Sequence, residues 1–294
     1  MSDYLSRYAE AGLYTMQGRL SAPQDGRFQS FPRQSWQLEI ERAAEIGLRG
    51  IEWIYDLFGE GANPLETAEG REGLRDLLAR RGLSVVSICA DYFMDRPLLR
   101  CSQAENVELI ERLHWLLGIC PELGVGRVVL PFVDASRIRD QAERDQVVAN
   151  LRQVLPQAER HGVELHLETD LAPQAFRELL DLLDHPLVKV NYDAGNSASL
   201  GYRPADEFAA YGRRVGSVHI KDRRLGAGTV PLGQGDTDFP SLREQLIEYG
   251  YQGDFVLQVA RGEAGDESRW LAGMAALAAD WLHGRALNDE RKPS

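Results

Sequence analysis

Cysteine is scarce in this sequence, and the few that occur do not suggest pairing. Cys89, Cys101 and Cys120 are odd in number and show no CxxC spacing. The pattern therefore argues against a secreted disulfide framework and against a four-cysteine zinc site. We expect reduced thiols in a cytoplasmic protein.

Long apolar runs and an excess of positive charge are also missing. No stretch approaches the roughly 18 consecutive apolar residues of a membrane helix. The first residues, MSDYLSRYAEAG, lack the basic and then apolar order of a signal peptide. The net charge is −12, and phosphate backbones and anionic membranes attract basic surfaces. We therefore expect neither nucleic acid nor a membrane as a partner.

What the sequence does contain is a regular alternation of short apolar runs with helical stretches. Its 294 residues are 44% hydrophobic, which suits a single α/β barrel of about 250 residues. Eight strand-then-helix units predict a (β/α)8 TIM barrel, one domain over residues 1–284 with a polar, flexible tail over 285–294. A doubly wound open sheet is the alternative, but the first turn lacks a GxGxxG fingerprint. The predicted strands are Leu13 to Met16, Gly50 to Trp53, Leu83 to Ala90, Arg127 to Phe132, Val163 to Glu168, Leu187 to Tyr192, Val215 to Ile220 and Asp254 to Ala260.

Polar side chains stand at the ends of the last four predicted strands. In a barrel these ends meet at one face, where active sites lie. Strands five to eight finish at Glu168, Asp193, His219 and Gln258. A lone carboxylate at such a position is usually a cap or a solvated charge, but three such groups on neighbouring strands predict a joint metal site. Two carboxylates, an imidazole and an amide oxygen suit a divalent ion; we expect Mn²⁺, with Mg²⁺, Co²⁺ and Zn²⁺ as alternatives.

Two further groups lie on the inner faces of the predicted strands. Glu52, on the second strand, is a candidate hydroxyl-binding or second acid/base residue, and a plain salt bridge is the alternative. His166 has the same strand parity as Glu168, so it should point into the barrel one layer deeper. It is a candidate substrate contact, although a hydrogen-bonded or core role suits it better.

A basic and glycine-rich set can supply substrate recognition. Arg19, Lys221 and Arg223 are candidates for binding an anionic or hydroxyl-rich ligand, and Lys221 also for acid/base work. Gln234 lies in the loop 233–235, GQG, whose backbone N–H groups can bind an anion. Arg224 is a further candidate, and the alternative for the adjacent arginines Arg223 and Arg224 is that one or both face solvent, which we expect of at least one.

Linked motifs carry a family resemblance. They are MQGRLS at 16–21, GIEWIYD at 50–56, HLETD at 166–170, NYDAGN at 191–196, VHIKDR at 218–223, VPLGQGDTDF at 230–239 and FVLQVARG at 255–262. On these the chain resembles the xylose-isomerase-like TIM barrels, in particular the sugar phosphate isomerase/epimerase group. The likeness runs from about residue 11 to residue 283.

The resemblance implies a metal held by Glu, Asp, His and a second Glu, and here Gln258 replaces the last. In the epimerases two glutamates flank one sugar carbon, and glutamine cannot be a general base. We therefore expect Glu168 to act as base beside a metal-bound carbonyl through a metal-stabilised enediolate. Epimerisation would need a second acid, for which Lys221 and His166 are the candidates. The expected activity is a metal-dependent isomerase or epimerase of a sugar or sugar phosphate, EC 5.1 or 5.3. The resemblance also implies a homo-oligomer.

Three alternatives remain open on the sequence. One base suffices for a lyase or dehydratase of the same fold acting on a keto sugar. A non-catalytic sugar-binding derivative would explain the lost carboxylate. An endonuclease-IV-like repair enzyme needs a three-metal cluster with several histidines, and near the mouth the sequence offers only His166 and His219.

Overall fold

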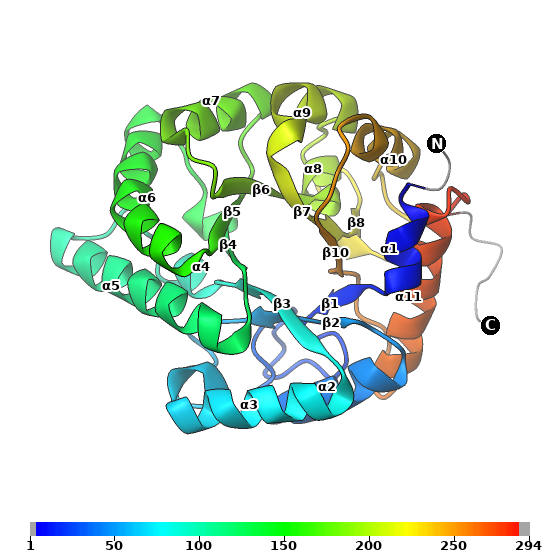
Figure 1. Ribbon diagram of the computed structural model, residues 1–294. Coiled ribbons are helices and arrows are strands. Elements are labelled where there is room, and N and C mark those ends of the chain that lie inside the picture. Colours follow the sequence, from blue (N-terminus) through cyan, green and yellow to red (C-terminus); the bar gives the residue numbers. More distant parts are fainter. Residues whose placement is uncertain (1–3, 288–294) are drawn as a thin grey trace.

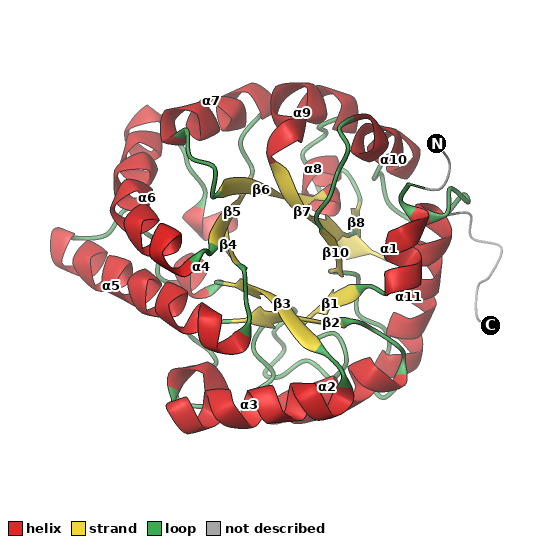
Figure 2. Cartoon of the chain, viewed as in Figure 1, coloured by secondary structure: helices red, strands yellow, loops and turns green. Residues whose placement is uncertain are grey.

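Eight parallel strands close into a barrel in the computed structural model, which describes residues 4–287. The strands run in the order β1-β10-β7-β6-β5-β4-β3-β2, and helices surround them on the outside (Figure 2). The predicted TIM barrel, in a single domain, is confirmed. The barrel strands are β1 Tyr14–Met16, β2 Gly50–Ile54, β3 Ser84–Cys89, β4 Arg127–Phe132, β5 Glu164–Thr169, β6 Val188–Asp193, β7 Val215–Ile220 and β10 Asp254–Leu257.

The helices form a ring around these strands (Figure 1). They are α1 Ser6–Ala11, α2 Trp36–Glu45, α3 Ala68–Arg81, α4 Tyr92–Asp95, α5 Gln103–Ile119, α6 Gln141–His161, α7 Pro173–Leu183, α8 Ala194–Ser199, α9 Pro204–Tyr211, α10 Phe239–Glu248 and α11 Glu267–Leu282. Short 3-10 turns are η1 Pro64–Glu66, η2 Cys120–Leu123, η3 Asp134–Ser136 and η4 Gly212–Arg214. Within the described part of the chain, no helix is both long and apolar enough to span a bilayer.

Local sequence sets the ends of several helices. Thr67 caps α3 by accepting a hydrogen bond from the backbone N–H of Gly70, and α3 ends at Gly82 in the left-handed conformation. Ser102 and Glu105 form a capping box that starts α5. These capping residues determine where the helices begin and end, and therefore where the chain enters the next strand.

Two irregularities of the barrel lie beside polar residues. The pairing register shifts between Ile51 and Glu52 on β2, and between Val190 and Asn191 on β6. A bulge re-aims the side chains that follow it. Glu52 and Asn191 are both buried and both reach the same cluster, described below.

Element bounds differ from the predicted ones mainly at the last strand. β4 and β7 have the predicted bounds, whereas β10 ends at Leu257 instead of Ala260. The short helices α1, α4 and α8, and the hairpin of β8 Asp222–Arg223 with β9 Thr229–Val230, were not predicted because each is too brief to show a periodic pattern.

The expected tail begins with residues that contact the barrel. Arg285 Nη1 lies 2.6 Å from Asp280 Oδ1, and Leu287 packs against the core. Residues 288–294 of that predicted tail lie outside the described residues.

Candidate metal and substrate site

Three side chains from neighbouring strands converge at the carboxyl end of the barrel. Glu168 on β5, Asp193 on β6 and His219 on β7 each offer one ligand atom, and these atoms lie within 4.8 Å of one another. Their exposed fractions are 6%, 3% and 0%. The structure thus brings together the three residues proposed from the sequence. Their mixture of oxygen and nitrogen donors suits a divalent ion.

Asp193 is fixed by the start of the short helix that follows it. Its Oδ1 accepts a hydrogen bond from the backbone N–H of Asn196 at 2.8 Å, which caps α8. A Cβ at Gly195 would lie 2.6 Å from Cγ of Lys221, so a glycine is needed there for the lysine side chain to pass. The turn chemistry expected for Asp193-Ala194-Gly195-Asn196 therefore exists, and it leaves Asp193 Oδ2 facing the cluster.

Glu52 lies behind the imidazole of His219. Its Oε1 is 2.8 Å from His219 Nε2, and Ser87 Oγ donates to its Oε2 at 2.5 Å. The Glu52–His219 contact is close but poorly aligned, and neither atom has a well-aligned hydrogen-bond partner. Glu52 is fully buried, which favours an orienting role over direct contact with a substrate.

Asn191 holds the other side of the imidazole. Its Nδ2 donates to Glu168 Oε2 at 2.7 Å and lies 3.1 Å from His219 Nδ1, while its Oδ1 accepts from Ser217 Oγ at 2.6 Å. An amide nitrogen only donates, so this arrangement requires an unprotonated Nδ1. His219 then presents a lone pair on the side where Glu168 lies, with Nδ1 and Oε2 3.6 Å apart.

The electrostatics of the cluster also favour a cation. Burial and the nearby charge of Asp193 raise the pKa of Glu168 to about 7. Burial opposes a charge on His219, but Glu52, Glu168 and Asp193 outweigh it and raise the pKa of His219 to about 9. The carboxylates around His219 therefore favour a positive charge at this place in the barrel.

Lys221 crosses the mouth of the barrel next to this cluster. Its Nζ donates to Asp193 Oδ2 at 3.0 Å, to Gln258 Oε1 at 3.1 Å and to Asn196 Oδ1 at 3.2 Å. Asn196 Nδ2 in turn donates to Glu168 Oε1 at 2.7 Å. A single amide thus links the candidate base to the ammonium group, and Gln258 faces Lys221 where a carboxylate was expected from the resemblance.

The glycine-rich loop is anchored in a way that the sequence did not predict. Asp222 is buried, and its carboxylate accepts hydrogen bonds from the backbone N–H groups of Gly233, Gly235 and Thr237. The idea that the loop 233–235 offers free N–H groups to an anion is therefore wrong, because Asp222 already occupies those of both glycines. Gln234 is exposed on this loop.

The remaining candidates lie at different depths. Arg223 is half-buried and donates from Nη1 to Asn196 Oδ1 at 2.8 Å. Arg224 is exposed, as expected of at least one of the two adjacent arginines. Arg19 is buried, and burial lowers its pKa to about 9. His166 is fully buried, 2.7 Å from Ser217 Oγ and 2.8 Å from Glu164 Oε2, so its place favours the deeper hydrogen-bonded role over substrate contact.

Several residues that bond to these groups were not proposed as site residues from the sequence. Ser87 and Ser217 are among them, as are Gln29, which bonds to Arg19 and Gln258, and Asp91, which accepts from Gln29. Asn191 and Asn196 belong to the motif NYDAGN, whose polar character was a usable signal. Asp91, at the end of β3, was visible as a polar strand end. Gln29 lies in an irregular loop, which gave no signal at all.

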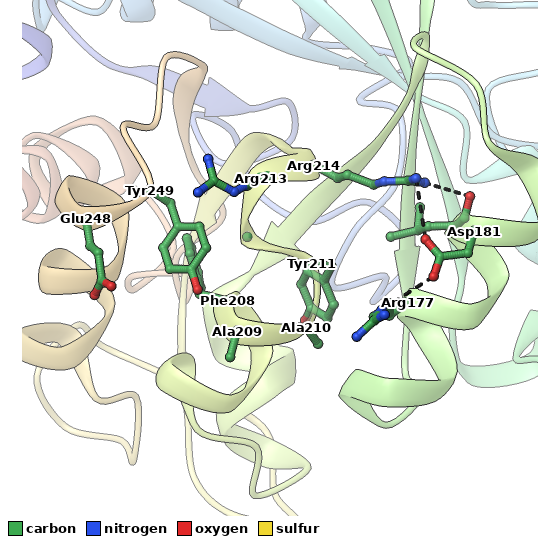
Figure 3. Close-up of a pocket in the computed structure, with 12 residues that line it drawn as sticks. Arg177, Asp181, Phe208, Ala209, Ala210, Tyr211, Arg213, Arg214, Glu248 and Tyr249 are labelled. Atoms are coloured by element: carbon green, nitrogen blue, oxygen red, sulfur yellow. Dashed lines mark hydrogen bonds and ion pairs between the residues drawn. The ribbon is translucent and has the colours of Figure 1, made fainter.

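A separate hollow lies away from the mouth, beside η4 at the start of β7 (Figure 3). It encloses about 310 Å³ between α7, α9 and α10. Arg177 and Arg214 both pair with Asp181 there. Because it opens at the amino-terminal end of a barrel strand, it is distant in the fold from the candidate site.

Comparison with known proteins places the chain in a family. Residues 40–279 match the model of the xylose isomerase-like TIM barrel. The chain belongs to this family. The family resemblance predicted from the sequence is confirmed. The two relatives described next are named as epimerases of sugar phosphates.

Two relatives and one solved structure illustrate the likeness. The chain is 30% identical over 203 residues to a 2-epi-5-epi-valiolone 7-phosphate 2-epimerase of Actinoplanes sp., covering 67% of this chain and 72% of that protein. It is 24% identical over 260 residues to the L-ribulose-5-phosphate 3-epimerase UlaE of Escherichia coli, covering 86% and 90%. The structure of the IOLI protein with a binding zinc atom has a TM-score of 0.73 at 18% identity, covering 91% and 97%.

Proposed function

We propose that this protein is a divalent-metal-dependent epimerase of a keto sugar phosphate. The observation that supports this proposal most strongly is a hydrogen-bonded link. Asn196 bonds both to the buried carboxylate of Glu168 and to the ammonium group of Lys221, beside the three residues that could hold a metal. The two named relatives, both epimerases of sugar phosphates, support the substrate class.

Glu168, Asp193 and His219 would hold the metal, with Gln258 as a neutral fourth group. A divalent ion bound there polarises a substrate carbonyl and stabilises the negative charge that forms on its oxygen. Manganese is our expectation for its identity. Glu52 and Asn191 keep His219 in the orientation that the ligand set needs.

The proton transfers are assigned to Glu168 and Lys221. The Glu168 carboxylate would remove the proton from the carbon next to the carbonyl; the C–H electron pair then forms a C=C bond, and the C=O π pair moves onto the oxygen. The Lys221 ammonium then gives a proton to the opposite face of that carbon, so its configuration inverts. Solvent exchange returns Glu168 to the carboxylate and Lys221 to the ammonium form. This scheme replaces the two-glutamate scheme that Gln258 excludes.

Arg223 is our candidate for the phosphate, because its half-buried guanidinium group lies beside Asn196 at the mouth. Small-molecule sugars, a cytoplasmic location and a homo-oligomeric state remain predictions. Size-exclusion chromatography with light scattering measures the last of these.

The test is product analysis after metal exchange. Protein stripped of metal and reloaded separately with Mn²⁺, Mg²⁺, Co²⁺ or Zn²⁺ is incubated with L-ribulose 5-phosphate and related ketose phosphates, and products are identified by NMR. We expect a metal-dependent epimer with an unchanged carbon chain. Absence of any epimer from all the ketose phosphates would contradict the proposal.

A dehydratase is the second candidate, and Gln258 is the observation that favours it. Elimination of water beside a ketone needs a single base, which Glu168 supplies. Loss of water with growth of an enone absorbance in the same incubations would select this function over epimerisation.

A further inference from the structure

The mouth of the barrel is bridged by one side chain from a loop. Gln29 lies in the segment 22–30, between β1 and α2. Arg19 Nη2 and Gln258 Nε2 both donate to its Oε1 at 3.0 Å, and its Nε2 donates to Asp91 Oδ2 at 2.8 Å. A single carboxamide therefore joins groups that follow β1, β3 and β10.

This bridge closes the route to the metal cluster. Gln258 also bonds to Lys221, so a continuous line of hydrogen bonds runs from Asp91 through Gln29 to Asp193. Asp193 and Gln258 are only 3% and 5% exposed. A sugar that bonds to these groups must replace hydrogen bonds of this line.

The other contacts of the segment 22–30 are made by residues outside the apolar core: Gln24 Nε2 lies 3.4 Å from Ser35 Oγ, and the guanidinium carbon of Arg27 lies 4.8 Å from the centre of the Phe58 ring. Arg261 Nε donates to the backbone oxygen of Phe28 at 2.7 Å, and Arg19 Nη1 lies 3.5 Å from the same oxygen. Residues 22, 23 and 25–28 are exposed. The segment can therefore move without disturbing the packed core of the barrel.

We propose that Gln29 is a built-in substitute for substrate. Its carboxamide occupies a subsite, formed by Arg19, Asp91 and Gln258, that takes two adjacent neutral oxygens of the sugar once the segment 22–30 swings away. The identity of the ligand as a sugar rests on the proposed function, whereas the closure by Gln29 does not.

The chemistry of the three partners defines what the subsite accepts. Arg19 only donates hydrogen bonds, and the Asp91 carboxylate accepts them. A carboxamide satisfies both with an acceptor and a donor on neighbouring atoms, as does an α-hydroxyketone or a vicinal diol. The carboxylate of Asp91 disfavours a phosphate at this place, which assigns Arg19 to a neutral part of the substrate.

Cys89 provides a direct probe of this closure. Its Sγ donates to Asp91 Oδ1 at 3.2 Å, and the residue is 2% exposed. Cys120 is also buried, but it lies in η2 with its Sγ bonded to the backbone oxygen of Leu116. Modification of Cys89 reports local opening at the mouth, and modification of Cys120 reports global unfolding.

The first arm of the experiment labels the full-length protein with iodoacetamide and follows each cysteine by mass spectrometry. Gln29→Ala removes hydrogen bonds that include two to charged groups, Arg19 and Asp91, so we expect Cys89 to react about tenfold faster or more, with Cys120 unchanged. The control Gln24→Ala lies in the same segment and loses one long contact, 3.4 Å to Ser35 Oγ. It should stay within about twofold of wild type. Two results would contradict the closure of the mouth by Gln29. One is an equal rate of Cys89 labelling in Gln29→Ala and Gln24→Ala, and the other is a faster Cys89 reaction that is matched by an equally faster Cys120 reaction.

The second arm asks what the vacated subsite binds. A concentration series of dihydroxyacetone, the smallest α-hydroxyketone probe, should slow the labelling of Cys89 in Gln29→Ala, and inorganic phosphate should not. Protection by phosphate alone, or by neither compound, would refute the subsite. Labelling requires neither metal nor turnover, so a protein with no epimerase activity can still support or refute this inference.

Discussion

The carboxylate behind His219 allows the metal site to be tested without touching a ligand. Glu52 is fully buried, 2.8 Å from His219 Nε2. Glu52→Gln keeps the size of the side chain and removes its negative charge. Loss of such a carboxylate behind a metal-binding histidine weakens metal binding by about 10- to 100-fold, which equals about 1.4 to 2.8 kcal/mol.

Thermal unfolding over a metal titration measures this effect. At a free metal concentration of about 100 times the wild-type Kd, binding stabilises the folded protein by about 2.7 kcal/mol. A tenfold weaker Kd lowers that gain to about 1.4 kcal/mol by the same relation. Calorimetric titration supplies the Kd values directly.

A matched control keeps the carboxylate and removes only its other partner. Ser87→Ala deletes the hydroxyl that donates to Glu52 Oε2, and we expect it to change the metal Kd by less than about threefold. Wild-type affinity in Glu52→Gln, or an equal loss in both variants, would refute the orienting role of Glu52.

Three further predictions concern neighbouring groups. Because the pKa of Glu168 is raised to about 7, the metal-free protein keeps that proton at lower pH and metal binding releases it. The metal affinity should therefore rise about tenfold or more per pH unit up to about pH 7, and a flat calorimetric profile over that range would contradict this. Asn191→Leu should weaken metal binding and lower the free energy of unfolding by about 1 to 3 kcal/mol, since it removes the buried hydrogen bonds of Asn191 to Glu168 and Ser217; denaturant titration checks the second effect, and unchanged stability would count against it. Asp222→Asn removes the charge that holds three backbone N–H groups, so proteolysis within 224–238 should accelerate while cleavage elsewhere stays constant. Equal cleavage rates within 224–238 in the wild type and in Asp222→Asn would show that the Asp222 carboxylate does not hold this loop.

The barrel could be predicted because its signals are local and repeated. Strands such as Arg127–Phe132 and Val215–Ile220 are short, mainly apolar segments between helical stretches, and the structure has them at the predicted bounds. In a parallel barrel the carboxyl ends of the strands meet at one face. This predicted that Glu168, Asp193 and His219 lie close together, as they do in the structure.

What escaped prediction depends on the path of the chain in space. The reach of Gln29 into the mouth depends on how an irregular loop folds back, and periodicity carries no information about that. Asn191 stands in the polar motif NYDAGN, but its contacts with Glu168 and His219 depend on how β6 lies between β5 and β7. The N–H groups of Gly233 and Gly235 could not be assigned to Asp222 without the loop conformation.

Exchange of a substrate C–H for deuterium tests the central claim most directly. Metal-loaded protein is incubated in D2O with L-ribulose 5-phosphate and related ketose phosphates, and deuterium next to the carbonyl is followed by NMR. We predict metal-dependent exchange by the wild type and its loss in Glu168→Gln. Absence of exchange with every ketose phosphate, or full exchange by Glu168→Gln, would contradict the assignment of Glu168 as the base of a metal-dependent epimerase.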